Sequence, residues 1–315
     1  MLDWMGRELN YLRISLTERC NLKCIYCRDE SEHCKGKHEL TLSELTRLMN
    51  IFVELGVTKV RLTGGEPLVR KDLEQIVAMA ASFPQIKDLC MTTNAQGLEH
   101  RIADLHRAGL KRVNISLDSL NEQRYRKMTR GGSLQSALNG IHAAMELGMQ
   151  VKINAVLVRG ENDSEIDDFL ALAKELPLDI RFIELMPFSA LGAAGTQRVL
   201  GKEILAKHME LRPIPGRNAS QPSEDYCGEG FQGRVGFINP VSHKFCDRCN
   251  RIRLTSDGKL RMCLGNDFET DLRPYLQEHP EQLFQVMKEA IYNKPQKHSF
   301  EEAYHANRAM NQIGG

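Results

Sequence analysis

A repeated alternation of short apolar segments and longer amphipathic ones is the feature of this 315-residue sequence that most restricts its fold. Such alternation is typical of β-α units, in which the helix after each strand returns the chain to the same end of a parallel sheet. Six units can be counted, and no low-complexity tract or long linker interrupts them. The pattern therefore predicts an α/β fold. Strands are expected at residues 11–17, 57–63, 86–92, 110–118, 149–158 and 178–186.

The clearest predicted helix follows the first strand segment. Thr41 and Glu44 have the spacing of a capping box, in which each side chain bonds to the backbone of the other residue. Apolar residues then recur at helical spacing from Leu45 to Phe52, and Gly56 is expected to end the helix.

The strand segments alternate apolar and polar residues, which is unusual for a parallel sheet covered on both faces. In the first segment Leu12 and Ile14 share one face, while Arg13 lies on the other. Burying unpaired cations is costly, so this polar face is expected to line a hydrated or ligand-filled cavity. An open antiparallel sheet with one wetted face is the alternative, but helical crossovers favour a partial barrel. The polar face would carry Arg13, Ser15, Thr17, Arg61, Thr63, Asn114, Ser116, Asp118, Lys152 and Asn154.

The overall charge balance excludes a strong electrostatic pull toward nucleic acid or an anionic membrane. Lys and Arg total 42 against 41 for Asp and Glu, which gives a formal net charge of +1. Neither a signal-peptide core nor an 18-residue apolar run occurs, so a cytoplasmic location is expected. In a reducing compartment the nine cysteines are expected to be metal ligands or free thiols rather than disulfides.

Three cysteines fall close together after the first strand segment. Cys20, Cys24 and Cys27 have the spacing C-x3-C-x2-C, which allows one loop to place three thiolates around a soft-metal centre. A fourth coordination position would remain without a protein ligand, unlike a closed structural zinc site. A zinc site completed by His33 is the alternative.

A glycine-rich loop is predicted after the second strand segment. Residues 63–70 read TGGEPLVR, in which Gly64 and Gly65 allow a close approach of the backbone to a ligand. Glu66 adds a carboxylate, and Pro67 stiffens the start of the next helix. A Gly-Gly turn alone is weak evidence, but together with the cysteine loop it indicates a cofactor site at the carboxyl ends of the strands.

A second set of three cysteines lies in the last third of the sequence. Cys246, Cys249 and Cys263 have the spacing C-x2-C-x13-C, and the intervening TSDGKL predicts a tight hairpin that brings the third thiol back. A zinc site completed by Cys227 or His243 is open as an alternative on spacing alone.

Two arginines next to this second set favour a ligand site. Arg251 and Arg253 occupy alternate positions of a short predicted strand and should point the same way. Guanidinium groups fixed in this manner suit an anionic or purine ligand.

The cysteine loop followed by a GGEP-type motif resembles the radical S-adenosylmethionine (SAM) superfamily. The resemblance implies a 4Fe-4S cluster on Cys20, Cys24 and Cys27, with the amino and carboxylate groups of SAM on its open iron. Reductive cleavage of SAM would then supply a 5′-deoxyadenosyl radical.

From about Gly6 to Gly315 the chain further resembles the GTP 3′,8-cyclases of molybdenum cofactor biosynthesis, which are lyases. The resemblance implies a partial (β/α)6 TIM-type barrel over residues 1–215. It also implies a C-terminal region over residues 216–315 with a second 4Fe-4S cluster and a Gly-Gly tail that reaches the active site. The similar runs are LRISLTERCNLKCIYC, RLTGGEPLVR, SLDSL, RFIELMP, CNRIRLTSDGKLRMCL and the terminal IGG.

This resemblance also implies roles for individual residues. SAM would be held by the first cluster with Tyr26, Gly65, Ser116 and Met186. The guanine of GTP would bind the open iron of the second cluster, on Cys246, Cys249 and Cys263. The radical would take hydrogen from C3′ of GTP, and C3′ would then attack C8. Arg251, Arg253 and Lys152 are the expected catalytic residues, and the other GTP contacts would be Arg13, Arg61, Thr92 and Arg181.

The expected partners follow from the same resemblance. They are GTP, SAM, an electron donor and, through transfer of the product, cyclic pyranopterin monophosphate synthase. No nucleic acid or membrane partner is expected, and the sequence is compatible with a homodimer. A peptide-modifying radical enzyme and a non-catalytic iron-sulfur electron carrier are the rival functions.

Some positions depart from the family pattern or have no expected role. Arg28 replaces a frequent methionine, and Ala95 replaces the glycine usual in TTNG. Cys34, Cys90 and Cys227 lie outside both cysteine sets, and Cys34 is interpreted as a free thiol. Smaller departures occur at Asn239 and Lys244.

Overall fold

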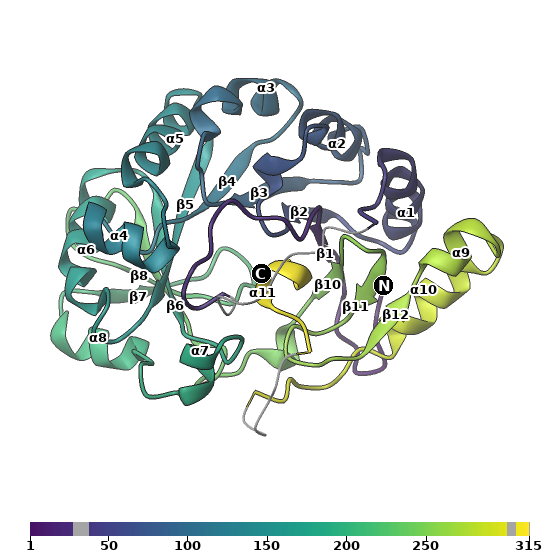
Figure 1. Ribbon diagram of the computed structural model, residues 1–315. Helices are drawn as coiled ribbons and strands as arrows, with labels where there is room; N and C mark the ends of the chain where they lie inside the picture. Colours follow the sequence, from purple (N-terminus) through teal and green to yellow (C-terminus); the bar gives the residue numbers. More distant parts are fainter. Residues whose placement is uncertain (28–37, 301–306, 315) are drawn as a thin grey trace.

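The structure is a computed structural model that describes residues 1–27, 38–300 and 307–314. Six parallel strands form an arc with helices on its outer side (Figure 1). Each predicted strand is present, with both ends within two residues of its expected range, and the parallel pairing excludes the open antiparallel sheet. The partial barrel is confirmed. Its strands are β1 (Tyr11–Ser15), β2 (Lys59–Thr63), β3 (Asp88–Thr93), β4 (Arg112–Ser116), β5 (Gln150–Leu157) and β6 (Asp179–Glu184).

The helices between these strands cover the apolar face of the sheet. The predicted capping box is present, since the backbone N–H of Glu44 donates to Oγ1 of Thr41 at 3.2 Å and the N–H of Thr41 donates to Glu44 at 2.8 Å. Phe52 from this helix is fully buried with Leu12 and Val60 of the strands. The helices are α1 (Leu42–Glu54), α2 (Leu73–Ala81), α3 (Ile102–Arg107), α4 (Glu122–Thr129), α5 (Leu134–Glu146) and α6 (Ile166–Glu175).

The C-terminal third extends the same sheet at both edges. Strand β9 (Arg234–Ile238) pairs in parallel with β6, and β8 (Glu224–Cys227) and β7 (Arg212–Ile214) continue that edge as antiparallel strands. At the other edge β10 (Arg251–Leu254) pairs in parallel with β1. The chain segments on either side of residue 215 therefore share one sheet, and the expected domain boundary there stays a prediction.

The predicted TSDGKL hairpin is confirmed at the β1 edge. Strand β11 (Lys259–Arg261) is antiparallel to β10, and β12 (Glu269–Asp271) is antiparallel to β11. Outside the arc lie α7 (Ala190–Ala194), α8 (Gly201–Lys207), α9 (Arg273–Gln277) and α10 (Leu283–Tyr292). The last helix, α11 (Met310–Ile313), lies inside the arc instead (Figure 1). Single 3-10 turns span Pro67–Val69, Leu98–His100, Asp163–Glu165 and Cys246–Arg248.

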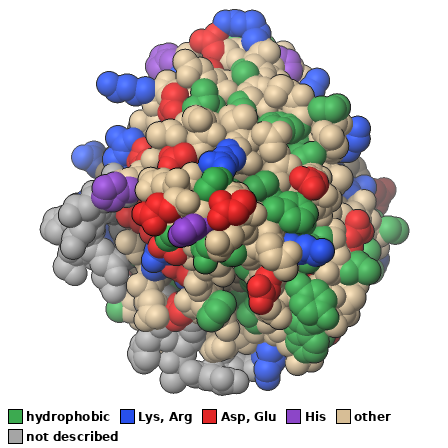
Figure 2. Space-filling view, turned by 90° about the vertical axis from the view of Figure 1, so that its right-hand side faces the viewer, with side chains coloured by type: hydrophobic (Ala, Val, Ile, Leu, Met, Phe, Trp, Pro, Cys, Tyr) green, Lys and Arg blue, Asp and Glu red, His purple; other side chains and the backbone are tan. Residues whose placement is uncertain are grey.

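Positive and negative side chains are interspersed on the face of the molecule shown in Figure 2, with apolar ones between them. Cations gather inside the arc instead, where Arg61, Lys152 and Arg253 are each less than 10% exposed. In the described part of the chain, no helix has the length and apolarity required to cross a bilayer.

Candidate active site

Two adjoining cavities lie on the polar face of the sheet. The first, which we name the cluster cavity, has a volume of about 250 Å³ and lies toward the carboxyl ends of the strands. The second, the cationic cavity, has a volume of about 460 Å³ and lies toward their amino ends. Arg13, Arg61, Asn154 and Arg251 line both cavities, so a ligand could extend from one into the other.

The first cysteine set opens onto the cluster cavity. Cys20, Cys24 and Cys27 all line it, and the N–H of Cys27 donates to the carbonyl of Cys24 at 3.0 Å in a tight turn. Burial raises the pKa of Cys24 well above its usual value, and the neighbouring carboxylate of Asp118 acts in the same direction. A bound iron would reverse this effect, because coordination deprotonates a thiol. Three thiols facing one cavity fit a cluster with an open iron.

The glycine loop packs directly on the cysteine loop. A Cβ atom at Gly65 would lie 2.3 Å from the carbonyl oxygen of Arg19, and one at Gly64 would lie 2.7 Å from that of Thr17. The N–H of Gly65 donates to the carbonyl of Thr17 at 2.6 Å. The glycines therefore serve a close backbone contact within the protein, in addition to lining the cavity.

Glu66 fixes the conformation of the glycine loop through hydrogen bonds. Its carboxylate accepts hydrogen bonds from Oγ1 of Thr93 and the N–H of Asn94, both at 2.7 Å, and from the N–H of Leu68 at 3.0 Å. Burial nevertheless raises the pKa of Glu66 to about 7. The carboxylate holds the loop that covers the first cysteine set.

All four predicted SAM contacts line the cluster cavity with the cysteines. They are Tyr26, Gly65, Ser116 and Met186. The hydroxyl of Tyr26 donates to Asp118 at 2.7 Å, and Asp118 also accepts from the N–H of Val156 at 2.9 Å. Burial raises the pKa of Asp118 to about 6. Whether these residues bind SAM stays a prediction.

Three arginines stand side by side across the sheet. Arg253 on β10 is level with Arg13 on β1, which is level with Arg61 on β2. Burial lowers the pKa of Arg253 well below its usual value, and Arg13 and Arg251 lower it further. Adjacent buried cations repel one another, so an anion bound beside this row would be stabilised by it.

A second group of charges lines the cationic cavity. Lys152 on β5 is 2% exposed and donates to Asp179, whose other oxygen accepts from Arg217 at 2.8 Å. Burial lowers the pKa of Lys152 to about 7, aided by Arg181 and opposed by Asp179. Burial and the charge of Arg61 lower the pKa of Arg181 to about 10. The structure thus brings the predicted GTP contacts together in the two adjoining cavities.

The second cysteine set adjoins the cluster cavity at the β1 edge. Phe245 and Leu264, which neighbour Cys246 and Cys263 in the chain, line the cavity together with Arg251 and Arg253. The guanidinium of Arg251 lies over the ring of Phe245, at 4.6 Å from its centroid.

Cations surround the second set. Burial raises the pKa of Cys249, but Arg251 and Lys294 outweigh this effect and lower the pKa to about 6. The thiolate form is therefore favoured at Cys249, whereas burial raises the pKa of Cys246.

The C-terminal tail enters the cavity from inside the arc. The N–H of Met310 donates to the carbonyl of Cys27 at 3.3 Å, and Asn311 donates to the carbonyl of Glu18 at 2.9 Å. The carbonyl of Gly314 accepts from Arg253 at 2.8 Å. The tail contacts the first cysteine loop and an arginine beside the second, which supports the expected approach of the tail to the site. Gly315 itself lies outside the described residues.

Three buried side-chain oxygens of the cluster cavity have no hydrogen-bond partner among the described residues. They are Oγ1 of Thr92, Oδ1 of Asn154 and Oε1 of Glu184. An unpaired buried acceptor is costly, so a ligand that brings donors is needed to satisfy them. SAM and GTP both carry such donors, and the residues present therefore fit these groups.

Several residues of the site were not found from the sequence. Glu184 and Lys294 are the main ones, together with Lys59 and Arg217 of the cationic cavity. Only Glu184 had a usable signal, because it lies near the carboxyl end of the predicted strand 178–186, where polar residues face the site. The sequence places Asp118 on the polar face, but its bond to Tyr26 could not be predicted.

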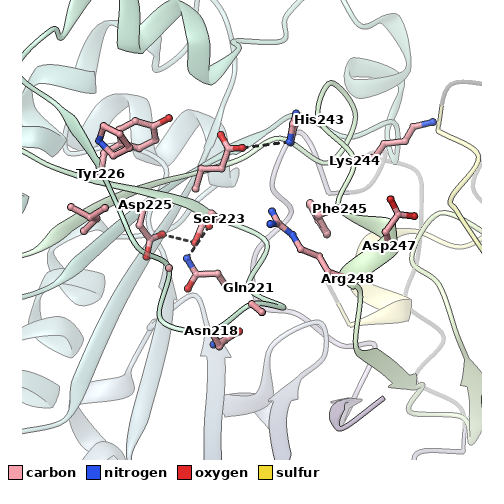
Figure 3. A pocket seen from close by; sticks show the side chains of 15 residues that line it. Asn218, Gln221, Ser223, Asp225, Tyr226, His243, Lys244, Phe245, Asp247 and Arg248 are labelled. Atoms are coloured by element: carbon pink, nitrogen blue, oxygen red, sulfur yellow. Dashed lines mark hydrogen bonds and ion pairs between the residues drawn. The ribbon is translucent and has the colours of Figure 1, made fainter. Parts of the chain in front are cut away.

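A third pocket adjoins the cationic cavity, with which it shares Asn218 and Gln221 (Figure 3). It has a volume of about 630 Å³ and shares Phe245 with the cluster cavity. Its polar side chains pair with one another: His243 lies 3.4 Å from Glu224, and the hydroxyl of Ser223 donates to Asp225 at 2.7 Å (Figure 3).

The residues that would complete a zinc site with the second cysteine set, Cys227 and His243, both have other partners in the structure. His243 pairs with Glu224, and the thiol of Cys227 donates to carbonyls of its own β-hairpin, at 3.5 Å to Gly228 and 3.9 Å to Gly233. Among residues 1–27, 38–300 and 307–314, no three His, Cys, Asp or Glu side chains are grouped to hold one metal ion. His33, Cys34 and Arg28 lie outside the described residues.

Cys227→Ala is therefore expected to retain the full iron content of the protein. The thiol of Cys227 contacts its own hairpin, so its loss removes no ligand of the second set. Iron and sulfide assays after anaerobic reconstitution check this prediction. A loss of iron matching one cluster would instead restore Cys227 as a fourth ligand.

Comparison with known proteins identifies the family. Residues 14–173 match the radical SAM superfamily, and residues 178–300 match the family described as Molybdenum Cofactor Synthesis C. A protein of Alkaliphilus oremlandii named GTP 3′,8-cyclase is 45% identical over the full length of both chains. Proteins with the same name from Moorella thermoacetica and Listeria monocytogenes are 45% and 42% identical, over at least 98% of each chain.

Solved structures show the same fold at low sequence identity. Streptococcus suis SuiB bound to S-adenosylmethionine is 15% identical with a TM-score of 0.60, over 92% of this chain and 64% of SuiB. SuiB bound to the precursor peptide SuiA gives a TM-score of 0.62 at 14% identity, over 92% of this chain and 66% of SuiB. With the full-length relatives, these matches show that the chain belongs to the radical SAM superfamily and, within it, to the GTP 3′,8-cyclase family.

Proposed function

We propose that this protein is a radical SAM GTP 3′,8-cyclase, which catalyses the first step of molybdenum cofactor biosynthesis. The observation that carries the proposal is the arrangement of the site. Two sets of three cysteines adjoin one cavity, and a row of buried arginines runs across the strands between them. One set can start radical chemistry while the other holds an anionic nucleotide.

Two 4Fe-4S clusters are the cofactors, and SAM and GTP are the substrates. Cys20, Cys24 and Cys27 would hold the first cluster. When bound, the first cluster and SAM supply a 5′-deoxyadenosyl radical that takes hydrogen from C3′ of GTP, so that C3′ joins C8 in (8S)-3′,8-cyclo-7,8-dihydroguanosine 5′-triphosphate. Cys246, Cys249 and Cys263 would hold the second.

The protein's own residues bind and position GTP. Arg13, Arg61 and Arg253 form the row that receives negative charge, and Lys152 with Arg181 extends it into the cationic cavity. Positioning of this kind supplies most of the rate in such a reaction, since the sugar and base must meet in one geometry. Arg251 would lie against the guanine, because it lines the cavity next to the second cysteine set.

SAM would bind at the opposite wall. Tyr26, Gly65, Ser116 and Met186 surround the first cysteine set, and the unpaired oxygens of the cluster cavity offer acceptors for its amino and ribose groups. The tail covers this part of the cavity through Met310 and Gly314, which excludes water from the reacting groups.

A peptide substrate is the rival reading, because SuiB shares the fold. The cationic side chains on the polar face of the sheet favour a nucleotide substrate instead. A triphosphate supplies several negative charges to the buried arginine row, whereas a neutral peptide backbone supplies none.

The test is an anaerobic reconstitution with iron and sulfide, followed by reduction in the presence of SAM and GTP. The expected result is two clusters per chain, 5′-deoxyadenosine and a cyclised nucleotide. Deoxyadenosine formed equally with and without GTP, and no nucleotide product, would contradict the proposed function.

Further partners belong to the same proposal. The reaction needs an electron donor twice: one electron reduces the first cluster for SAM cleavage, and a second, with a proton, would reduce the purine radical left at N7 when C3′ joins C8. The product would pass to cyclic pyranopterin monophosphate synthase. We also propose a cytoplasmic location and a homodimeric state. Size-exclusion chromatography with light scattering tests the latter.

The affinity for GTP is expected to fall as the pH rises above about 7. Lys152 has a pKa of about 7 in the free protein because it is buried, so at lower pH it is already protonated. A bound triphosphate raises that pKa, so above pH 7 binding must take up a proton and weakens by up to about tenfold per pH unit. Calorimetric Kd values for GTP from about pH 6 to about pH 9 test this loss of affinity, because Lys152 titrates within that range.

Lys152→Arg provides the control for this titration. An arginine stays protonated throughout the range, so the variant reports the titration of the nucleotide and of the groups of the site other than Lys152. Equal pH slopes in the variant and the unaltered protein would show that Lys152 does not titrate on binding.

Arg308→Ala is expected to uncouple SAM cleavage from cyclisation. Arg308 joins the tail to Asp257 at 2.8 Å and to Glu269 at 3.1 Å, with Glu18 at 3.8 Å. Loss of charged hydrogen bonds worth about 1.5–3 kcal/mol would lower the ratio of docked to undocked tail roughly tenfold or more. The ratio of cyclised nucleotide to 5′-deoxyadenosine measures this effect.

Arg159→Ala is the matched control, because Arg159 pairs with Glu203 on the surface. It should leave the product ratio unchanged. An Arg308 variant with a normal ratio would show that these ion pairs do not position the tail.

A further inference from the structure

Lys294, just after α10, is a buried lysine beside the second cysteine set. Its side chain is almost completely buried, with 2% of the residue exposed. Its ammonium donates to the carbonyl of Arg251 at 2.9 Å and also to the carbonyl of Met262. Arg251 follows Cys249 by two residues, and Met262 precedes Cys263. One ammonium group therefore ties together the two chain segments that carry these cysteines.

The charge of Lys294 has no carboxylate partner among the described residues. Its two hydrogen bonds go to neutral carbonyls, and the charged groups facing it are the thiols of Cys249 and Cys263 with the cations Arg251 and Arg7. A buried cation is costly unless an anion balances it. Among the described residues that act on Lys294, the groups that could supply this negative charge are the sulfurs of Cys249 and Cys263, with whatever they bind.

The N-terminal segment fixes the position of Lys294. Arg7 donates to the carbonyl of Lys294 at 3.3 Å and to that of Cys246 at 2.9 Å, and it is held by Asp3 at 2.7 Å. The indole N–H of Trp4 also donates to the carbonyl of Lys294, at 2.9 Å. The backbone on either side of the cysteine set is therefore held in place before any cluster binds.

The first cysteine set has the opposite surroundings. After burial, the carboxylate of Asp118 has the largest effect on the pKa of Cys24, which it raises, and this carboxylate accepts a hydrogen bond from Tyr26. Groups around an iron-sulfur cluster tune its reduction potential through charge and hydrogen bonds. A cation near a cluster favours the reduced state, which carries one more negative charge.

We propose that Lys294 is the counter-cation of the second cluster, holding the Cys249 and Cys263 segments together and raising the reduction potential of that cluster. The inference rests on the two-cluster assignment of the proposed function. It makes Lys294 a positioning residue that contacts neither SAM nor GTP in the cavities described above. Its effect should appear in the second cluster alone and without any substrate.

The experiment isolates each cluster in the full-length protein. A Cys20→Ala/Cys24→Ala/Cys27→Ala background keeps only the second cluster, and a Cys246→Ala/Cys249→Ala/Cys263→Ala background keeps only the first. Each receives Lys294→Met, Lys294→Arg or, as a charge-matched control on exposed α10 surface, Lys288→Met. Iron content and redox titrations followed by electron paramagnetic resonance are measured without GTP.

Lys294→Met is expected to make the second cluster harder to reduce by about tenfold, or about 59 mV for one electron. Lys294→Arg and Lys288→Met should stay near the unaltered value, and the first cluster should not respond to any of the three. Loss of the second cluster in Lys294→Met but not in Lys294→Arg would equally support the proposal.

Two results would overturn it. One is an unchanged potential in Lys294→Met with full iron content, and the other is loss of the second cluster in both Lys294 variants, which would indicate packing rather than charge. A protein without these substitutions that binds only one cluster would instead refute the proposed function, and this inference with it.

Discussion

Replacement of Cys24 by alanine is expected to reduce SAM cleavage to the background of the uncatalysed reaction. Cys24 is the central cysteine of the first set, and it faces the cluster cavity with Cys20 and Cys27. Two thiolates cannot hold a four-iron cluster with one open site, because the cluster then lacks a ligand on two irons. The measurement is 5′-deoxyadenosine formed per chain after anaerobic reduction with SAM.

Two comparisons make this result specific to the first set. Iron content should fall by the share of one cluster, and the iron that remains should show the spectrum of the second. Cys90→Ala is the control, because Cys90 is buried on β3 and donates to the carbonyl of Val60. Normal cleavage in Cys24→Ala would remove this residue from the cofactor site.

Replacement of Cys263 by alanine is expected to abolish the cyclised nucleotide while the first cluster remains able to cleave SAM. Cys263 returns to Cys246 and Cys249 through the β10-β11 hairpin, and Cys263 and Cys249 both raise the pKa of Cys246. Under the proposed function the guanine would lose its iron in this variant, while Arg253 and Arg13 would remain to bind the triphosphate. Product analysis by chromatography should show deoxyadenosine without cyclised nucleotide.

The same variant should still bind GTP, although more weakly. Retained turnover to the cyclised product would show that the second set is dispensable for the reaction and serves another purpose, such as electron transfer. A parallel loss of SAM cleavage would indicate that the variant has damaged the barrel, which circular dichroism would reveal.

Much of the barrel could be predicted from the sequence, because each β-α unit is specified by contacts within itself. The six strands and the capping box at Thr41 depend on local periodicity and on residues three positions apart. The predicted strands extend one to two residues too far at several ends, where the chain turns into loops that carry site residues. Both cysteine sets were visible because their ligands lie close together in the sequence.

The edges of the sheet could not be predicted in this way. Strand β10 lies beside β1, although Arg251 follows its partner Tyr11 by about 240 residues in the chain. The row formed by Arg253, Arg13 and Arg61 depends on this pairing. The sequence indicated that each arginine was functional, but not that they were neighbours.

Residues whose function depends on burial were also beyond sequence reasoning. In the sequence Lys294 is an ordinary lysine after a helix. Only the folded structure shows that it is buried close enough to Cys249 and Cys263 to interact with them electrostatically. Arg308 is one basic residue in a polar tail until three carboxylates converge on it.

One departure from the family pattern does have a structural explanation. Ala95 has φ of +60°, a left-handed conformation in which glycine is not strained, and this accounts for the glycine usual at this position. Its methyl group is fully buried against Gly140 and the core. Packing of this kind can offset the cost of the backbone conformation.

The pairing of β10 with β1 has a consequence for how the protein is made. A ribosome releases β1 early, yet the strand that covers its outer edge is specified only by residues 251–254, near the end of translation. Until then β1 presents a row of unpaired backbone groups, which is a template for contact with other chains. Nascent chains of this protein should therefore depend on chaperones for longer than their early β-α units would require.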